Sequence, residues 1–301
     1  MYSRLIVPLD GSQLAEQVLP YARSLAKTLA ISVELLEVVD PDALTVLVNP
    51  EQGRFLDSLL ADRREKSRVY LERIGQSFSG TQVRCSVENG KAEHVIIDKA
   101  AADNSSLILM ATHGRSGIRR WLLGSVADKV LHGATNHLFL VRATDKGVTD
   151  GEAPLKKVIV PLDGSPLAEK VLPHVSELAQ KMRLEVLLLR AYALPPAMSA
   201  NEYGTYSEEL INQLEAEAKD YLKQTADNLE KTRVKGISSI TQIGFGAEEI
   251  ASVARATPDN FIAMCTHGRS GVTRWALGSV TERVVRHSGD PVLIIRAGSE
   301  R

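Results

Sequence analysis

Residues 5–11 of the chain read LIVPLDG, and residues 158–164 repeat this stretch as VIVPLDG. Asp10 therefore corresponds to Asp163, which lies 153 residues later. An apolar run that ends at Asp-Gly is typical of a buried strand that leads into a turn. The recurrence of this stretch indicates that the chain contains the same structural unit twice.

A second pair of stretches fixes the size of that unit. Residues 112–126 read THGRSGIRRWLLGSV, and residues 266–280 read THGRSGVTRWALGSV. Gly114 thus corresponds to Gly268, 154 residues later, so the two matches keep nearly the same spacing. A period of this length is too long for a solenoid and indicates a whole domain duplicated in tandem.

The length and the seam agree with two domains. At roughly 150 residues per domain, a chain of 301 residues holds two. The polar segment 143–156 reads ATDKGVTDGEAPLK and has the composition of a linker. We therefore expect domains over residues 1–145 and 154–301.

Each half alternates apolar strand-like runs with helical patterns. In the first half, Ser12 is a candidate N-cap for a helix over residues 14–30. The expected strands cover residues 5–9, 32–40, 82–88, 107–111 and 137–143, and the other expected helices include residues 61–74, 92–102 and 125–134. This order predicts an α/β fold of two tandem, doubly wound, Rossmann-like domains, each with a mostly parallel open sheet and helices on both faces. Ligands of such sheets bind at the carboxyl ends of the strands.

Composition and charge exclude several classes of protein. The 36 Lys and Arg residues balance 37 Asp and Glu residues, so the net charge of −1 gives no sign of a nucleic-acid partner. Two cysteines do not make a disulfide scaffold, and the seven histidines lack the spacing of a helical zinc site. The sequence has no uninterrupted apolar run of about 18 residues, so no membrane span is predicted. We expect a cytoplasmic protein with no metal site.

The repeated loop combines features that suit a phosphate group. Gly114, Gly117 and Gly124 allow backbone N–H groups to approach an anion closely, and a helix begins where the loop ends. Arg115 adds positive charge. Asp10 follows the first strand, where its carboxylate is placed to accept hydrogen bonds from ribose hydroxyls. A nucleotide needs both kinds of group.

A purely structural interpretation of the same loop stays open. Ser125 is followed three residues later by Asp128, and Ser279 by Glu282, as in capping boxes. In that case the two serines only cap their helices, and the loop has no ligand.

The motifs VPLDGS, THGRSG and LGSV resemble the universal stress protein family in its tandem form, over nearly the whole chain. The family's nucleotide signature is Gly, two residues, Gly, nine residues, Gly, then Ser or Thr. This resemblance implies ATP as the ligand and leaves open whether Mg²⁺ accompanies it. The implied nucleotide-binding residues are Asp10, Val38, Ala111, Gly114, Arg115, Gly124, Ser125 and Val126 in the first half, and Asp163, Ala191, Cys265, Gly268, Arg269, Gly278, Ser279 and Val280 in the second.

The chain departs from this signature at its first glycine. Ala111 stands there in the first half and Cys265 in the second. A lost hydrogen bond to a charged group, about 1.5–3 kcal/mol, weakens a site by roughly one to two decades. We therefore expect both halves to bind ATP, the first half more tightly. If the thiolate of Cys265 is stabilised, that residue is also a candidate sensor of oxidants.

Neither a Walker A motif nor a nucleophile–base pair is recognisable, so no catalytic residue is predicted. The favoured function is a regulatory ATP-binding protein of the stress response, acting through protein partners that the sequence does not identify. The alternatives are an interaction protein with degenerate pockets and a weak ATPase or nucleotidyl transferase. The apolar last strands, 137–143 and 291–297, would be sheet edges, which invite pairing with another strand. The family resemblance implies that the two halves pair with each other through these strands and leaves further self-assembly open. The alternative is that each strand is covered within its own half.

Overall fold

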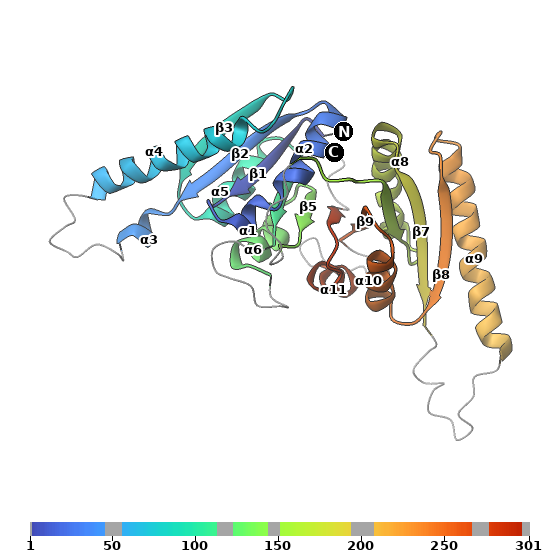
Figure 1. The fold of residues 1–301 in the computed structure, drawn as a ribbon. Helices are drawn as coiled ribbons and strands as arrows, with labels where there is room; N and C mark the ends of the chain where they lie inside the picture. Colours follow the sequence, from blue (N-terminus) through green and yellow to red (C-terminus); the bar gives the residue numbers. More distant parts are fainter. Residues whose placement is uncertain are drawn as a thin grey trace, which may run out of the picture. The chain divides into compact units, whose positions relative to one another are not determined.

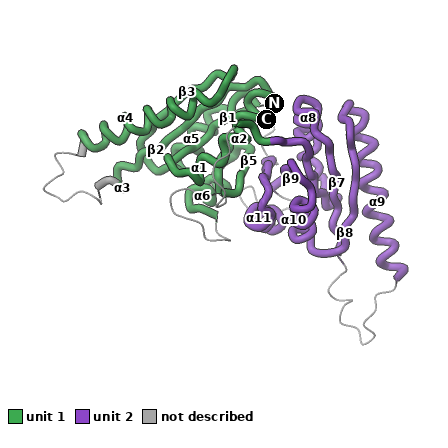
Figure 2. The backbone as a smooth tube through the Cα atoms, viewed as in Figure 1, with its two compact units in different colours: residues 1–153, 301 green, residues 154–300 purple. Residues whose placement is uncertain are grey.

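A computed structural model of the chain describes residues 2–45, 56–112, 123–143, 151–193, 208–266 and 277–296. The chain divides into two compact units, residues 1–153 and 154–300, which Figure 2 distinguishes by colour.

The first unit alternates strands and helices along the chain (Figure 1). Its strands are β1 (Arg4–Leu9), β2 (Ser32–Val39), β3 (Val83–Asn89), β4 (Ser106–Ala111) and β5 (Leu138–Val141). Its helices are α1 (Gln13–Glu16), α2 (Leu19–Leu29), α3 (Pro41–Thr45), α4 (Leu56–Gly75), α5 (Ala92–Ala101) and α6 (Ser125–Gly133).

Within this unit the strands follow the order β3-β2-β1-β4-β5, and all the neighbouring pairs are parallel. The chain first winds from β1 outward to β3 and then returns to β4 on the other side of β1. Right-handed crossovers consequently place α2 and α4 on one face of the sheet and α5 and α6 on the other. The winding direction reverses between β1 and β4, which is the switch point of the sheet.

The second unit repeats this plan. Its strands β6 (Lys157–Pro161), β7 (Glu185–Tyr192), β8 (Ile237–Ile243), β9 (Asn260–Cys265) and β10 (Val292–Ile295) follow the order β8-β7-β6-β9-β10, again in parallel. Its helices are α7 (Pro166–Glu169), α8 (Val171–Met182), α9 (Glu208–Glu230), α10 (Gly246–Ala256) and α11 (Ser279–His287). The predicted pair of doubly wound α/β domains is thus confirmed.

Burial explains why the inner strands are apolar along their whole length. Every residue of β4 and of β9 is buried, because helices cover both faces of the sheet at these positions. The core of the first unit consists of large side chains such as Leu5, Leu109 and Phe139, each of which is at most 1% exposed. This buried centre carries the strand ends from which the site is built.

The helix expected over residues 14–30 is in fact interrupted. α1 ends at Glu16 and α2 begins at Leu19. Pro20 lies in the first turn of α2 and has no N–H to donate to the preceding turn, so a continuous helix would lose a hydrogen bond there. Ser12 does cap α1, as expected: its side chain accepts a hydrogen bond from the Ala15 amide.

The segment just before the second unit packs on the first. Arg23 of α2 donates from Nε to the Gly151 carbonyl at 2.7 Å, and Lys27 forms an ion pair with Glu152 at 2.7 Å. The Ala153 amide donates to the Pro20 carbonyl at 3.0 Å. Residues 151–153 of the expected linker therefore belong to the compact first unit.

Among the described residues, no helix is both long enough and apolar enough to cross a bilayer.

Candidate functional site

Each unit contains a cavity at the carboxyl ends of its central strands. The cavity of the first unit has a volume of about 280 Å³ and that of the second about 290 Å³. Both lie at the switch point, where the chain leaves the neighbouring first and fourth strands of the unit in opposite directions. The first cavity is lined by residues from the end of β1 to α1, at the end of β2, at the start of α5, at the end of β4 and at the start of α6.

One part of each cavity is an apolar slot. In the first unit, Leu36 and Val38 of β2, Ile96 of α5 and Met110 of β4 form it. Alternation along β2 turns Leu36 and Val38 to the same face, toward α5. Leu189, Ala191, Ile250 and Met264 are the equivalent residues of the second unit. A flat apolar group such as a purine base fits a slot lined in this way.

A carboxylate lies beside the slot. Asp10 Oδ1 accepts hydrogen bonds from the Ser12 amide at 3.0 Å and from Ser12 Oγ at 2.6 Å. Asp163 makes the same two bonds with Ser165, at 2.9 and 2.6 Å. Since Ser12 also caps α1, the turn that starts this helix holds the Asp10 carboxylate in one orientation. A carboxylate has about four acceptor sites, so these two bonds do not by themselves exhaust it.

The start of α6 supplies the opposite chemistry. Gly124 is the N-cap, with φ −61° and ψ 147°, and its amide donates to the Thr112 carbonyl at 2.7 Å. The amides of Ser125, Val126 and Ala127 follow in the first turn, where N–H groups have no acceptor within the helix. All three residues line the cavity, so the positive end of the helix faces it. An anionic group is the natural partner.

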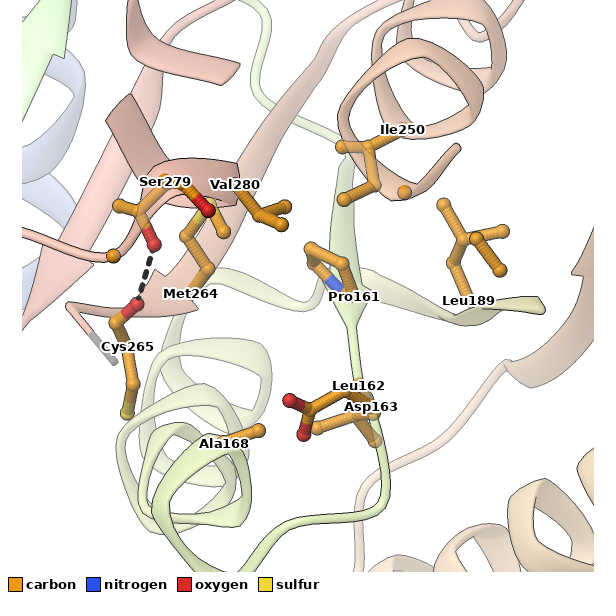
Figure 3. A pocket seen from close by; sticks show the side chains of 14 residues that line it. Pro161, Leu162, Asp163, Ala168, Leu189, Ile250, Met264, Cys265, Ser279 and Val280 are labelled. Atoms are coloured by element: carbon orange, nitrogen blue, oxygen red, sulfur yellow. Dashed lines mark hydrogen bonds between the residues drawn. The ribbon is translucent and has the colours of Figure 1, made fainter. Parts of the chain in front are cut away.

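The second unit has the same geometry. Gly278 caps α11 with φ −63° and ψ 142°, and its amide donates to the Thr266 carbonyl at 2.7 Å. Figure 3 shows Ser279 and Val280 at the start of this helix, and Asp163 across the cavity from them.

The capping-box interpretation of the two serines is wrong. Ser125 and Ser279 are the first residues inside their helices, and the preceding glycines occupy the cap position. The first helical hydrogen bonds run from the Asp128 amide to the Gly124 carbonyl and from Glu282 to Gly278. A glycine is tolerated at an N-cap and leaves the end of the helix uncovered.

The two residues at the first glycine position end the fourth strands. Ala111 is 7% exposed and Cys265 is 4% exposed, and both side chains line their cavities. Burial raises the pKa of the Cys265 thiol to about 12. The thiol therefore stays protonated at neutral pH, so the condition for an oxidant sensor at this position, a stabilised thiolate, is not met.

Of the residues predicted for the nucleotide, Asp10, Val38, Ala111, Gly124, Ser125 and Val126 come together in the first cavity. Asp163, Ala191, Cys265, Gly278, Ser279 and Val280 come together in the second. Gly114, Arg115, Gly268 and Arg269 lie outside the described residues.

Sequence reasoning missed the contribution of α5 and α10. Ala92 and Ile96 line the first cavity, and Gly246 and Ile250 line the second. Gly246 follows Ala92 by 154 residues, and Ile250 follows Ile96 by the same number, which is also the offset of the Gly-rich loops. Alignment of the two repeats could therefore have identified these positions as equivalent. The structure also adds Met110 and Met264 from the fourth strands.

In the described ranges, no group of three or more His, Cys, Asp or Glu side chains is arranged to hold a metal ion.

Comparison with known proteins agrees with the duplicated fold. A model of the universal stress protein family matches residues 1–142 and again residues 154–296. A universal stress protein of Mycolicibacterium smegmatis is 23% identical over 304 residues, covering 97% of this chain and 96% of its own. A universal stress protein of Methanocaldococcus jannaschii is 30% identical over 150 residues, covering 50% of this chain and 86% of its own.

Among solved structures, a universal stress protein of Archaeoglobus fulgidus matches with a TM-score of 0.67 and 17% identity. The match covers 99% of this chain and 100% of that one, so the fold of the whole chain has a known counterpart.

Proposed function

The chain belongs to the universal stress protein family, with one family domain in each half, and from this premise we propose that each half binds ATP at its switch point. One observation carries the proposal: an apolar slot, an oriented carboxylate and a helix N-terminus line the same cavity, and they do so twice. These three environments match the base, the ribose and the phosphates of a nucleotide.

Different residues of the cavity would bind different parts of the nucleotide. Leu36, Val38 and Met110 would bind the base, because apolar surface is removed from water on both sides. Asp10 would accept hydrogen bonds from the ribose hydroxyls. The first-turn amides of Ser125 and Val126 would donate to the phosphates, which the positive end of α6 also attracts. Gly114 and Arg115 would extend this anion site, as the family resemblance implies.

The size of the cavities supports a ligand of this class. Cavities that enclose small molecules measure about 300–1,000 Å³, and volumes of about 280 and 290 Å³ are just below the lower limit of that range. In the proposed complex, the base and part of the ribose would enter the cavity, and the phosphates would lie at its mouth beside the helix.

We further propose a regulatory role in the stress response, in which the bound nucleotide changes the interactions with protein partners. The sequence has no P-loop lysine and no recognisable base, which favours slow or absent hydrolysis. We also propose a cytoplasmic location, Mg²⁺ as a possible companion of the bound ATP, and pairing of the two halves through their last strands.

A charge placed at the helix N-cap tests nucleotide binding. Gly124→Asp places a carboxylate where the phosphates would bind, and Asp is itself a favoured N-cap residue, so α6 should persist. Two like charges about 4 Å apart repel by about 1 kcal/mol in water and about 4 kcal/mol near a protein surface. We expect ATP affinity in the first half to fall at least about tenfold.

Gly124→Asn is the matched control, since it has the shape of Asp without the charge and should weaken ATP much less. Gly278→Asp and Gly278→Asn form the same pair for the second half. Isothermal titration calorimetry of the full chain measures the ATP affinity of both sites. Absence of ATP binding in the unaltered chain would refute the proposal and favour degenerate pockets. Steady release of phosphate or pyrophosphate would favour the enzyme alternative.

A further inference from the structure

The two cavities have nearly equal volumes but different walls. About 280 Å³ in the first unit compares with about 290 Å³ in the second. Four of the lining positions nevertheless differ in size between the halves. Compared with the first half, two of these positions have smaller side chains in the second half and two have larger ones. The second cavity therefore has a similar volume, but the free space lies beside different wall residues.

The side chains that become smaller lie on β7 and α10. Val38 of the first unit corresponds to Ala191, and Ala92 corresponds to Gly246. A Cβ atom added to Gly246 would lie 3.8 Å from Val280 Cγ1, which is an ordinary van der Waals contact. The gap between α10 and α11 is therefore wide enough for a side-chain atom that this chain does not supply.

The side chains that become larger lie at the end of β9 and the start of α11. Ala111 corresponds to Cys265, and Ala127 corresponds to Thr281. Thr281 Oγ1 donates to the Cys265 carbonyl at 3.0 Å, the bond dashed in Figure 3, so this part of the wall is tied together. In Figure 3, Leu189 and Ile250 lie on one side of the cavity and Cys265 on the opposite side.

The residue next to the widened gap also changes in character. Lys91 precedes Ala92 and forms ion pairs with Asp40 at 3.1 Å and Asp42 at 3.0 Å. Its counterpart beside Gly246 is Phe245, a residue that is 68% exposed. The first cavity thus has a charged neighbourhood at this side, whereas the second has an exposed aromatic ring.

We propose that the second-half site prefers an adenine nucleotide with an apolar substituent on its base, whereas the first-half site prefers the unsubstituted base. This inference rests on the proposed nucleotide function, in which Val38 and Ala191 bind the base. The substituent would occupy the space left by Ala191 and Gly246. In the first half, the Val38 methyl groups and the Ala92 Cβ atom fill that space.

Steric discrimination of this kind has a known scale. One methylene group more or less in an apolar pocket changes relative affinity by about 10–200-fold. The two exchanges remove more than one methyl group, so a ratio of at least about tenfold between the halves is expected.

The experiment isolates each site in the full chain. Gly124→Asp leaves the second site, and Gly278→Asp leaves the first. The probes are ATP, N6-benzyl-ATP and 2-methylthio-ATP, each titrated by calorimetry. We expect at least one analogue to gain affinity relative to ATP by at least about tenfold in the second site compared with the first.

Exchange of the wall residues tests the cause. Ala191→Val with Gly246→Ala, added to Gly124→Asp, should remove the preference for the analogue. Val38→Ala with Ala92→Gly, added to Gly278→Asp, should create it in the first site. Because the two exchanges are independent, a folding defect in one still leaves the other to decide.

The outcomes separate the inference from the function on which it rests. Equal analogue-to-ATP ratios in the two sites would overturn the inference and leave nucleotide binding intact. Binding of every probe by the first site and of none by the second would also overturn the inference. Failure of both sites to bind any probe would overturn the proposed function itself.

Discussion

A buried carboxylate in the first unit should contribute strongly to its stability. Glu34 lies on β2 and is 3% exposed. Its oxygens accept from Arg4 Nη1 at 2.9 Å and from Ser86 Oγ at 2.7 Å, and Lys99 Nζ lies 3.1 Å away. Leu187 is the equivalent residue of the second unit, so the fold itself does not need a charge at this position.

The perturbation is Glu34→Gln, which keeps the shape and removes the charge. Removal of one partner from a buried ion pair costs about 3–5 kcal/mol when the remaining charge stays buried without compensation. Lys99 keeps its ion pair with Glu88 after the substitution, so the cost should be about 3 kcal/mol, the lower end of that range. Arg4 and Lys99 are about a quarter or less exposed, at 24% and 20%, so water compensates them only in part. For a domain of this size, each kcal/mol shifts the midpoint by about 2–4 °C, so a cost of about 3 kcal/mol should lower the midpoint of the first unit by roughly 6–12 °C.

The effect should depend on pH with a defined sign. Burial alone would raise the pKa of Glu34, but the hydrogen bond from Ser86 and the charges of Lys99 and Arg4 outweigh it and lower the pKa below 4.5. A group with a lowered folded-state pKa stabilises the protein above its unfolded pKa and loses this effect as pH falls through the folded value. The difference between Glu34→Gln and the unaltered chain should therefore be full at pH 7 and shrink below about pH 4.5.

Calorimetric melting of the full chain, with hydrogen exchange to assign the transition to its unit, measures both quantities. The matched control is Glu65→Gln, which removes the exposed ion pair with Arg68 on α4 and should leave the midpoint unchanged. An unchanged midpoint for Glu34→Gln at pH 7, or a difference that does not shrink as the pH falls below about 4.5, would refute the expected role of Glu34.

Three further predictions follow from other contacts. Cys265, with its pKa of about 12, should resist alkylation by iodoacetamide at pH 8 until the chain unfolds, as mass spectrometry of the labelled thiol will show; rapid labelling of the folded chain would contradict this. Ser12→Ala should cost about 1 kcal/mol in denaturant unfolding because α1 loses its cap, and it should weaken ATP binding in the first half by releasing Asp10; unaltered affinity would show that the orientation of this carboxylate is unimportant. Tyr221→Phe should destabilise the second unit by about 1 kcal/mol, since the phenol donates to Glu169 at 2.8 Å, and equal stability in urea would speak against that bond.

Much of the site was visible in the sequence because its parts follow strand ends and glycines. Asp10 comes directly after β1, and Gly124 directly precedes α6, so local patterns located both. The carboxyl ends of parallel strands meet at one edge of a sheet, which brings such residues together without further information. The interpretation of Ser125 as a cap failed by one residue, because a serine and a glycine both suit a helix start.

Other parts of the site depend on segments that are distant in the chain. Ile96 faces Leu36 only because the crossover to β4 passes over the α5 face of the sheet. Similarly, Glu34 meets Lys99 through the packing of α5 on β2. Nothing in the local pattern of β2 distinguishes this glutamate from Glu37, which turns to the other face and pairs with Arg63 of α4 at 2.6 Å.

By itself, the sequence determined the duplication, the α/β alternation and the place of the binding motifs, because repeats and apolar periodicity are written in local order. Only the tertiary structure decided how the two cavities differ. The space between Gly246 and Val280 and the bond between Thr281 and Cys265 arise where α10, α11 and β9 converge. The physical reason is that the shape of a cavity depends on the atoms that face one another across it, and these come from segments that the chain brings together only on folding.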